Sequence, residues 1–265
     1  MHGGRSVGAA EGSLDGVPSP ALPESRVSSL PTAASPARPA TALPRPAAVL
    51  WDMDGTIVDS EPYWIATETA LATEHGGTWT HEQGLAMVGK PIAHTAELLR
   101  DLGVPGTVEK ISDELVRRVS DLIRTEGAPW RPGARELLTA LGEAGIPCAL
   151  VTMSYREMAD AVLESLPEGT FAAVVTGDEV THSKPHPEPY LAAARMLGVD
   201  VRDCVAFEDS VPGVASAEAS GAATIVVPMM IPIPPAPGRS MVPTLEGLTI
   251  EDLAGVLAGT PLVRM

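Results

Sequence analysis

The chain has 265 residues, of which 45% are hydrophobic and 3% aromatic, so it can bury a sizeable core built mainly from small aliphatic side chains. Asp and Glu outnumber Lys and Arg by 34 to 18, and the net charge of −16 argues against nucleic acid or an anionic membrane surface as a main partner. Two cysteines give no disulfide framework, the N-terminal residues lack the apolar core of a secretory signal, and no apolar stretch has the length of a membrane span. We therefore expect a cytoplasmic protein.

Residues 1–46 are rich in Pro, Ala, Ser and Gly and show neither a helical nor a strand period. Such a segment cannot bury enough apolar area to offset the entropy lost on ordering, so the sequence predicts a disordered N-terminal extension. Order is expected to begin at Ala47, where the run AAVLWDMDG is typical of a buried strand that ends in a glycine turn.

After residue 130 the chain alternates between predicted helices and predicted strands. The helices carry apolar residues at spacings of three and four, and the strands are nearly continuous apolar runs. Helices are predicted at 134–145, 155–166, 188–198 and 211–221, and strands at 146–152, 171–177, 203–209 and 223–228. This pattern favours an α/β fold, in which a doubly wound parallel sheet is covered by helices on both faces.

Between the first and second predicted strands lies a long helical region, with amphipathic stretches at 92–103 and 108–123. It is too long for a simple crossover between neighbouring strands, so we expect a separate helical unit. The predicted domains are therefore an extension at 1–46, a catalytic core formed by 47–61 and 130–265, and a helical cap at 62–129.

Polar side chains gather where the predicted strands end. They are Asp52, Asp54, Gly55 and Thr56 after the first strand, Thr152 and Ser154 after the second, Lys184 after the third, and Glu208, Asp209 and Ser210 after the fourth. In an open α/β sheet, ligands bind beyond the carboxyl ends of the strands. We therefore expect these residues to meet at one rim of the sheet.

Asp52 and Asp54 are two residues apart, so on an extended segment both carboxylates point the same way and are able to share one cation. A hard divalent cation with oxygen ligands fits this pattern. The competing interpretation is an ordinary turn, in which Asp and Gly are common. Taken alone, the pair does not decide between the two.

The run WDMDGTIVDS resembles the first motif of the haloacid dehalogenase superfamily. VTMS is similar to the second motif, with Met153 at a position where Asn is usual, Lys184-Pro185 resembles the third, and FEDS at 207–210 followed by Gly213 resembles the fourth. The resemblance covers about residues 47–227 and includes a helical cap, as in the phosphatase and phosphomutase branch. It implies a Rossmann-like sheet with strand order 5-4-1-2-3.

The resemblance also implies roles for the site residues. Asp52 is expected to be the nucleophile of Mg²⁺-dependent phosphoryl transfer, and Asp54 the general acid and base. Lys184 and Thr152 are expected to bind the phosphoryl group. The expected Mg²⁺ ligands are Asp52, the Asp54 main-chain carbonyl, Asp209 and, directly or through water, Glu208.

Two further residues have a functional and a structural interpretation. Ser154 is a possible substrate contact, but we expect it to cap the next helix, as such residues often do. Lys90, in the VGK sequence of the predicted cap, is expected to be a second anion contact, with a solvated surface lysine as the alternative.

The leading functional hypothesis is a Mg²⁺-dependent phosphatase that acts on a small phosphorylated metabolite. The alternatives are a phosphomutase that uses the same nucleophile, a glycosyltransferase with a DxD metal site, and a binding domain without activity. A glycosyltransferase has no use for the lysine and the second acidic pair. The sequence identifies neither the substrate nor the choice between a monomer and a homodimer.

Overall fold

The computed structural model describes residues 43–264, so most of the predicted disordered extension lies outside the described residues. The described chain contains a parallel sheet with strand order β3-β2-β1-β4-β5-β6. Its strands are β1 (Ala48–Trp51), β2 (Cys148–Val151), β3 (Ala173–Val175), β4 (Cys204–Glu208), β5 (Ala223–Val226) and β6 (Ser240–Met241). The predicted order of the first five strands is confirmed, and it places β1 between β2 and β4.

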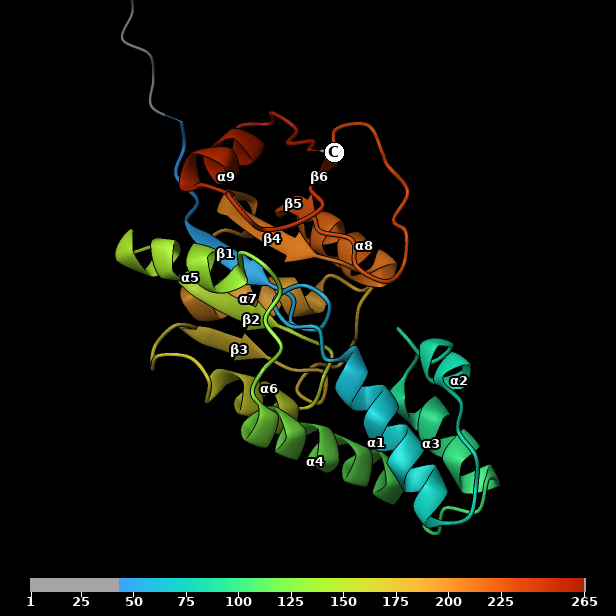
Figure 1. Cartoon of the computed structure of the whole chain (residues 1–265). Helices are drawn as coiled ribbons and strands as arrows, with labels where there is room; N and C mark the ends of the chain where they lie inside the picture. Colours follow the sequence, from blue (N-terminus) through green and yellow to red (C-terminus); the bar gives the residue numbers. More distant parts are fainter. Residues whose placement is uncertain (1–42, 265) are drawn as a thin grey trace, which may run out of the picture. The chain divides into compact units, whose positions relative to one another are not determined.

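Helices cover both faces of this sheet (Figure 1). They are α5 (Ala134–Glu143), α6 (Arg156–Leu163), α7 (Glu188–Leu197), α8 (Val211–Ser220) and α9 (Ile250–Leu257). In β1, Val49 and Trp51 pack in one apolar cluster with side chains of α5, α6 and α9, whereas Ala48 and Leu50 pack in another with side chains of α7 and α8. The alternation of side chains along a central, fully buried strand explains why its sequence is apolar throughout.

The elements after β5 were not predicted. Strand β6 has two residues and follows a proline-rich segment, so it lacks a strand pattern of its own; it forms because Ile225 and Val226 of β5 offer a free edge. Helix α9 has eight residues and begins at a capping box between Thr249 and Asp252. Among residues 43–264, none of the helices has both the length and the apolar character that a membrane crossing requires.

Between β1 and β2 the chain forms α1 (Glu61–Glu74), α2 (His81–Leu85), α3 (Ile92–Asp101) and α4 (Val108–Glu126). These helices surround an apolar cluster of their own, which includes Trp79, Leu99 and Leu115. The segments that enter and leave this helical unit run side by side, because Val58 and Trp130 form an antiparallel bridge. Helix α4 also packs on α6, where Arg124 pairs with Glu164.

Glu68 of α1 carries a carboxylate into this helical cluster. It is 3% exposed and accepts a hydrogen bond from Trp79 Nε1 at 3.0 Å. Burial raises the pKa of Glu68 from 4.5 to about 7, and the neighbouring Glu61 adds to the effect. The folded state therefore binds this proton more tightly than the unfolded chain, so its contribution to stability is lost as the pH rises from about 4.5 to about 7.

We expect Glu68→Gln to abolish the decrease in stability between pH 4.5 and about pH 7. The amide oxygen still accepts the hydrogen bond from Trp79, and it carries no charge. At pH 8 the variant should be more stable than the wild type by about 1–2 kcal/mol, a value discounted for partial solvation, and at pH 5 the difference should be small. Urea unfolding at both pH values measures this. The exposed Glu97→Gln is the control, and an equal effect of Glu68→Gln at both pH values would contradict the prediction.

Candidate active site

Lys184 joins the strand ends that the sequence predicted to meet. Its Nζ lies 2.7 Å from Asp52 Oδ1, 2.6 Å from Glu208 Oε1 and 2.9 Å from the Val151 carbonyl oxygen. Only 4% of the lysine side chain is exposed. One ammonium group thus bridges residues at the ends of β1, β2 and β4, and the predicted convergence of these segments is observed.

Glu208 holds this lysine in place. Its Oε1 accepts hydrogen bonds from Lys184 and from the Tyr190 hydroxyl at 2.7 Å, while Oε2 accepts from the backbone N–H groups of Asp209 and Ser210. Gly213 is required next to it, because a Cβ at that position would lie 2.0 Å from the Glu208 carboxylate. The carboxylate is fully buried and uses both oxygens within the protein.

The Asp54 carboxylate is held by two hydroxyl groups. Ser60 Oγ donates to its Oδ1, and Ser154 Oγ donates to its Oδ2 at 2.6 Å. The predicted capping role of Ser154 is therefore wrong: α6 has Tyr155 at its N-cap, without a side-chain hydrogen bond, and Ser154 is turned toward the acid. The pKa of Asp54 is raised by burial.

Asp52, Glu208 and Asp209 form a group in which one carboxylate oxygen of each residue lies within 4.8 Å of the other two. Asp209 rests against Gly55, which has a φ of +84° and whose hypothetical Cβ would lie 2.0 Å from an Asp209 oxygen. Only glycine allows both the left-handed turn and this close approach. Burial, followed by repulsion from the neighbouring carboxylates, raises the pKa values of Asp52 and Asp209.

Thr152 and Met153 shape the next segment of the rim. Thr152 is buried, and its Oγ1 accepts a hydrogen bond from the Ser154 N–H at 3.0 Å. Met153 stands at the position where Asn is usual in the similar motif, and its Sδ accepts a hydrogen bond from the Lys184 N–H at 3.4 Å.

The loop before α7 is held by Glu188, whose carboxylate accepts hydrogen bonds from the N–H groups of Thr181 and His182. Lys184 thus lies on a segment fixed at both ends.

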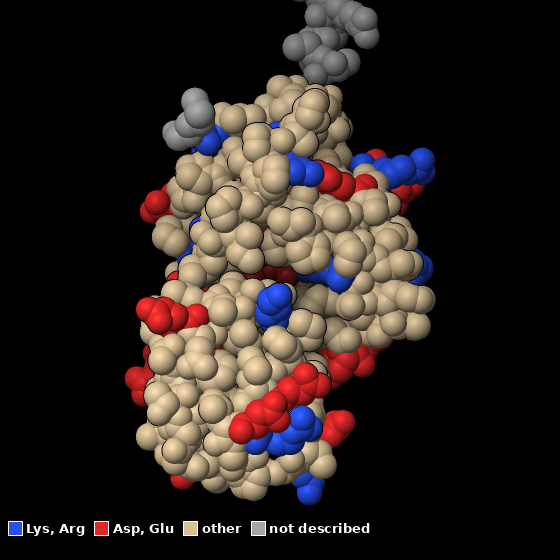
Figure 2. All heavy atoms as spheres, turned by 90° about the vertical axis from the view of Figure 1, so that its right-hand side faces the viewer, with Lys and Arg blue, Asp and Glu red and all other residues tan. Residues whose placement is uncertain are grey.

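Lys90 was predicted as a site residue, but within the described chain no polar contact links it to the residues around Lys184. It is exposed and lies between α2 and α3. Its neighbour Gly89 comes near the core, since a Cβ there would lie 3.6 Å from Ile231 Cδ1. Figure 2 shows a hollow between the core and the helical unit, with acidic atoms at its floor and Lys or Arg atoms at its rim.

Sequence reasoning missed two residues that organise the site. Tyr190, in the first turn of α7, is fully buried against Glu208, and its ring lies 5.2 Å from Lys184 Nζ. Arg131 donates to the carbonyl oxygens of Gly55, Val227 and Pro228. The position of Tyr190 three residues after His186-Pro187 gave no signal, and Arg131 lies in a connector without a recognisable motif.

The geometry described above agrees with comparisons to known proteins. The family model for haloacid dehalogenase-like hydrolases matches residues 46–221, a range that contains every strand end of the site. This chain belongs to that hydrolase family.

The chain is also similar to curated proteins, one of which is named as a phosphatase. The chain is 30% identical to Protein CbbY of Cupriavidus necator over 68% of this chain and 78% of the relative. It is 32% identical to hexitol phosphatase B of Escherichia coli over 68% of this chain and 83% of the relative. Both likenesses support the assignment of the chain to this family.

Solved structures show the same fold. CbbY of Rhodobacter sphaeroides in complex with xylulose-(1,5)bisphosphate has a TM-score of 0.69 and 25% identity, covering 82% of this chain and 100% of that one. A beta-phosphoglucomutase of Clostridium difficile has a TM-score of 0.63 at 19% identity, covering 80% of this chain and 97% of that one, a likeness of fold alone.

Proposed function

We propose that this hydrolase cleaves a small phosphomonoester through an aspartyl-phosphate on Asp52, with Mg²⁺ as its cofactor. The observation that supports this most is the buried contact of Lys184 with Asp52 beside Asp209. A carboxylate that attacks a phosphate dianion needs cationic charge at the point of attack, and a fixed ammonium group supplies part of it.

The donor set at the strand ends fits Mg²⁺. Carboxylate oxygens are the ligands that this ion prefers, and Asp52 and Asp209 present theirs within one group. We propose these two side chains and the Asp54 main-chain carbonyl as ligands, with Glu208 supporting them while it holds Lys184. When bound, Mg²⁺ supplies positive charge to the phosphoryl oxygens.

The chain's own residues divide the proton and phosphoryl transfers between them. An Asp52 oxygen forms the bond to phosphorus while the ester P–O bond breaks, and the Asp54 carboxyl gives its proton to the departing oxygen. Asp54 then takes a proton from water as that water attacks phosphorus, which releases phosphate and frees Asp52. Its raised pKa and its two serine partners suit a carboxyl that must begin protonated.

Three further assignments complete the proposal. Thr152, buried at the end of β2, and Lys184 bind phosphoryl oxygens. Residues 62–129 act as a cap over the rim, where Lys90 supplies a second anion contact. Ser154 acts through its hydrogen bond to Asp54 and thus orients the acid.

The test is release of inorganic phosphate from a panel of phosphorylated metabolites by the full chain, with Mg²⁺ and after chelation. We expect release in Mg²⁺ without any bisphosphate activator, and a loss of roughly 100-fold or more on chelation. Isomerisation that depends on a bisphosphate would identify a mutase instead. Turnover that is unchanged by chelation would contradict the assigned cofactor.

A further inference from the structure

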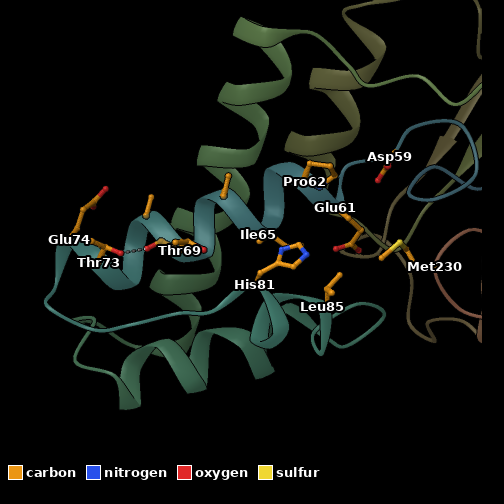
Figure 3. Close-up of a pocket in the computed structure, with 12 residues that line it drawn as sticks. Asp59, Glu61, Pro62, Ile65, Thr69, Thr73, Glu74, His81, Leu85 and Met230 are labelled. Atoms are coloured by element: carbon orange, nitrogen blue, oxygen red, sulfur yellow. Dashed lines mark hydrogen bonds between the residues drawn. The ribbon is translucent and has the colours of Figure 1, made fainter.

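A cavity of about 900 Å³ lies between α1, α2 and the loop that joins β5 to β6. One wall is the outer face of α1, the second is α2, and the third is Met230 of the loop. Figure 3 shows Glu61, His81, Leu85 and Met230 directed toward one another at one end, while the rest of the cavity follows α1 toward Thr73. No residue of the site described above lines this space.

The inner end of the cavity begins beside the proposed acid. Ser60, whose hydroxyl donates to Asp54, lies directly between Asp59 and Glu61, and both of these line the cavity. Burial, followed by repulsion from the Asp54 and Asp59 carboxylates, raises the pKa of Glu61 to about 7. The oxygen that Asp54 would protonate belongs to the leaving group, which would therefore lie near this end of the cavity.

The chemistry of the walls restricts what can occupy the cavity. Its lining holds three carboxylates and His81, and none of the lining residues, all within 43–264, is Lys or Arg. Glu74 at the outer end is already paired with Arg118 at 2.7 Å. The unpaired acids therefore lie at the inner end, where an added anion would meet like charges at low effective dielectric.

The remaining wall is apolar and lacks a partner. Leu85 is 38% exposed and Met230 is 44% exposed, and both are among the few large hydrophobic side chains that the described chain leaves at its surface. Apolar side chains that converge on one space gain free energy when a ligand removes them from water.

We propose that this cavity binds the leaving group of the substrate and selects an aliphatic leaving group that is neutral or cationic over an anionic one. The inference rests on the proposed phosphatase function and names its substrate class. It assigns a specificity role to Met230 and Leu85, and it makes Glu61 the group that repels anions or accepts a hydrogen bond from a hydroxyl or ammonium group.

The loop that carries Met230 is built to hold it there. Arg131 binds the carbonyl oxygens at the start of the loop, and Arg239 pairs with Glu218 and donates to the Pro234 carbonyl near its end. Ile233 is buried against Val214 of α8 and Val226 of β5. Because both ends of the loop are fixed, Met230 is held in position as one wall of the cavity.

The experiment measures kcat/KM at pH 8, where Glu61 is mostly ionised, for two matched series of phosphomonoesters in Mg²⁺. In the first, ethyl, butyl and hexyl phosphate differ only in aliphatic length, and we expect a rise of roughly threefold for each added methylene, somewhat below the full burial value. In the second, phosphoglycolate is compared with its carboxamide, and the neutral amide should be hydrolysed roughly tenfold faster or more.

Substitutions of cavity residues test whether the preferences for a longer aliphatic chain and for the neutral amide arise in this cavity. Met230→Ala and Leu85→Ala should flatten the dependence of kcat/KM on chain length. Met196→Ala, which removes a methionine that is 60% exposed on α7, is the matched control and should keep the wild-type slope. Glu61→Gln should bring the ratio between the amide and phosphoglycolate close to one.

The two proposals fail differently. If neither these esters nor any member of the metabolite panel is hydrolysed in Mg²⁺, the proposed function is wrong. If ethyl phosphate is hydrolysed but the rate does not change with chain length, or phosphoglycolate is preferred over its amide, the function stands and the assignment of this cavity is overturned. A wild-type slope in Met230→Ala and Leu85→Ala would likewise overturn it.

Discussion

Replacement of Asp52 by Asn is expected to lower kcat for any phosphomonoester by about 10⁴-fold or more, because the amide cannot form the aspartyl-phosphate. The fold should persist, since Asn keeps an oxygen that accepts the hydrogen bond from Lys184 and removes one of the carboxylates crowded around it. Phosphate release under saturating substrate and Mg²⁺ measures the activity, and circular dichroism with urea unfolding measures the fold.

Asp113→Asn is the matched control, because it makes the same chemical change at an exposed position of α4. It should leave kcat and the free energy of unfolding unchanged within error. Retention of a substantial fraction of wild-type kcat by folded Asp52→Asn would rule out a covalent mechanism at this residue.

Lys184→Met is expected to reduce both activity and stability. The substitution leaves the buried carboxylates of Asp52 and Glu208 without their shared cation, and removal of one partner from a buried ionic group costs about 3 kcal/mol of unfolding free energy. Loss of a fixed charge at the phosphoryl site should lower kcat by about 10³-fold. Urea unfolding and phosphate release provide the two measurements.

The exposed Lys110→Met on α4 is the control for the loss of one positive charge, and it should change stability by less than about 0.5 kcal/mol. If Lys184→Met unfolds at the same urea concentration as this control, then the lysine does not neutralise the carboxylates as its contacts indicate. The stability measurement remains informative even if the variant has no activity.

The core and the rim were predictable because they depend on local patterns that repeat. Buried parallel strands have continuous apolar sequences, and each strand that contributes to the site ends in a polar residue. Asp52, Lys184 and Asp209 could be assigned to one rim from this pattern and the family resemblance, although they are far apart in the sequence. The pattern therefore predicts at which edge of the sheet each strand ends.

Other features depend on tertiary contacts that leave no periodic signal. Ser154 occupies a position typical of a helix cap, but its hydroxyl is turned toward Asp54, to which it donates a hydrogen bond, and it does not accept from the N–H groups at the start of α6. Strand β6 forms on an edge supplied by β5, and Tyr190 reaches Glu208 across the interior. The cavity beside α1 depends on a side chain from residue 230, so no local window reveals it.

The central position of β1 has a consequence for synthesis on the ribosome. This strand emerges first, but its hydrogen-bonding partners are β2 at residues 148–151 and β4 at residues 204–208. Both edges of this apolar strand therefore stay free until β2 has been made, and one edge stays free until β4 has been made, a state that favours aggregation. In a sheet whose consecutive strands pair, each edge would be covered soon after it is made, whereas here the central strand waits for partners about 100 and 150 residues further along the chain.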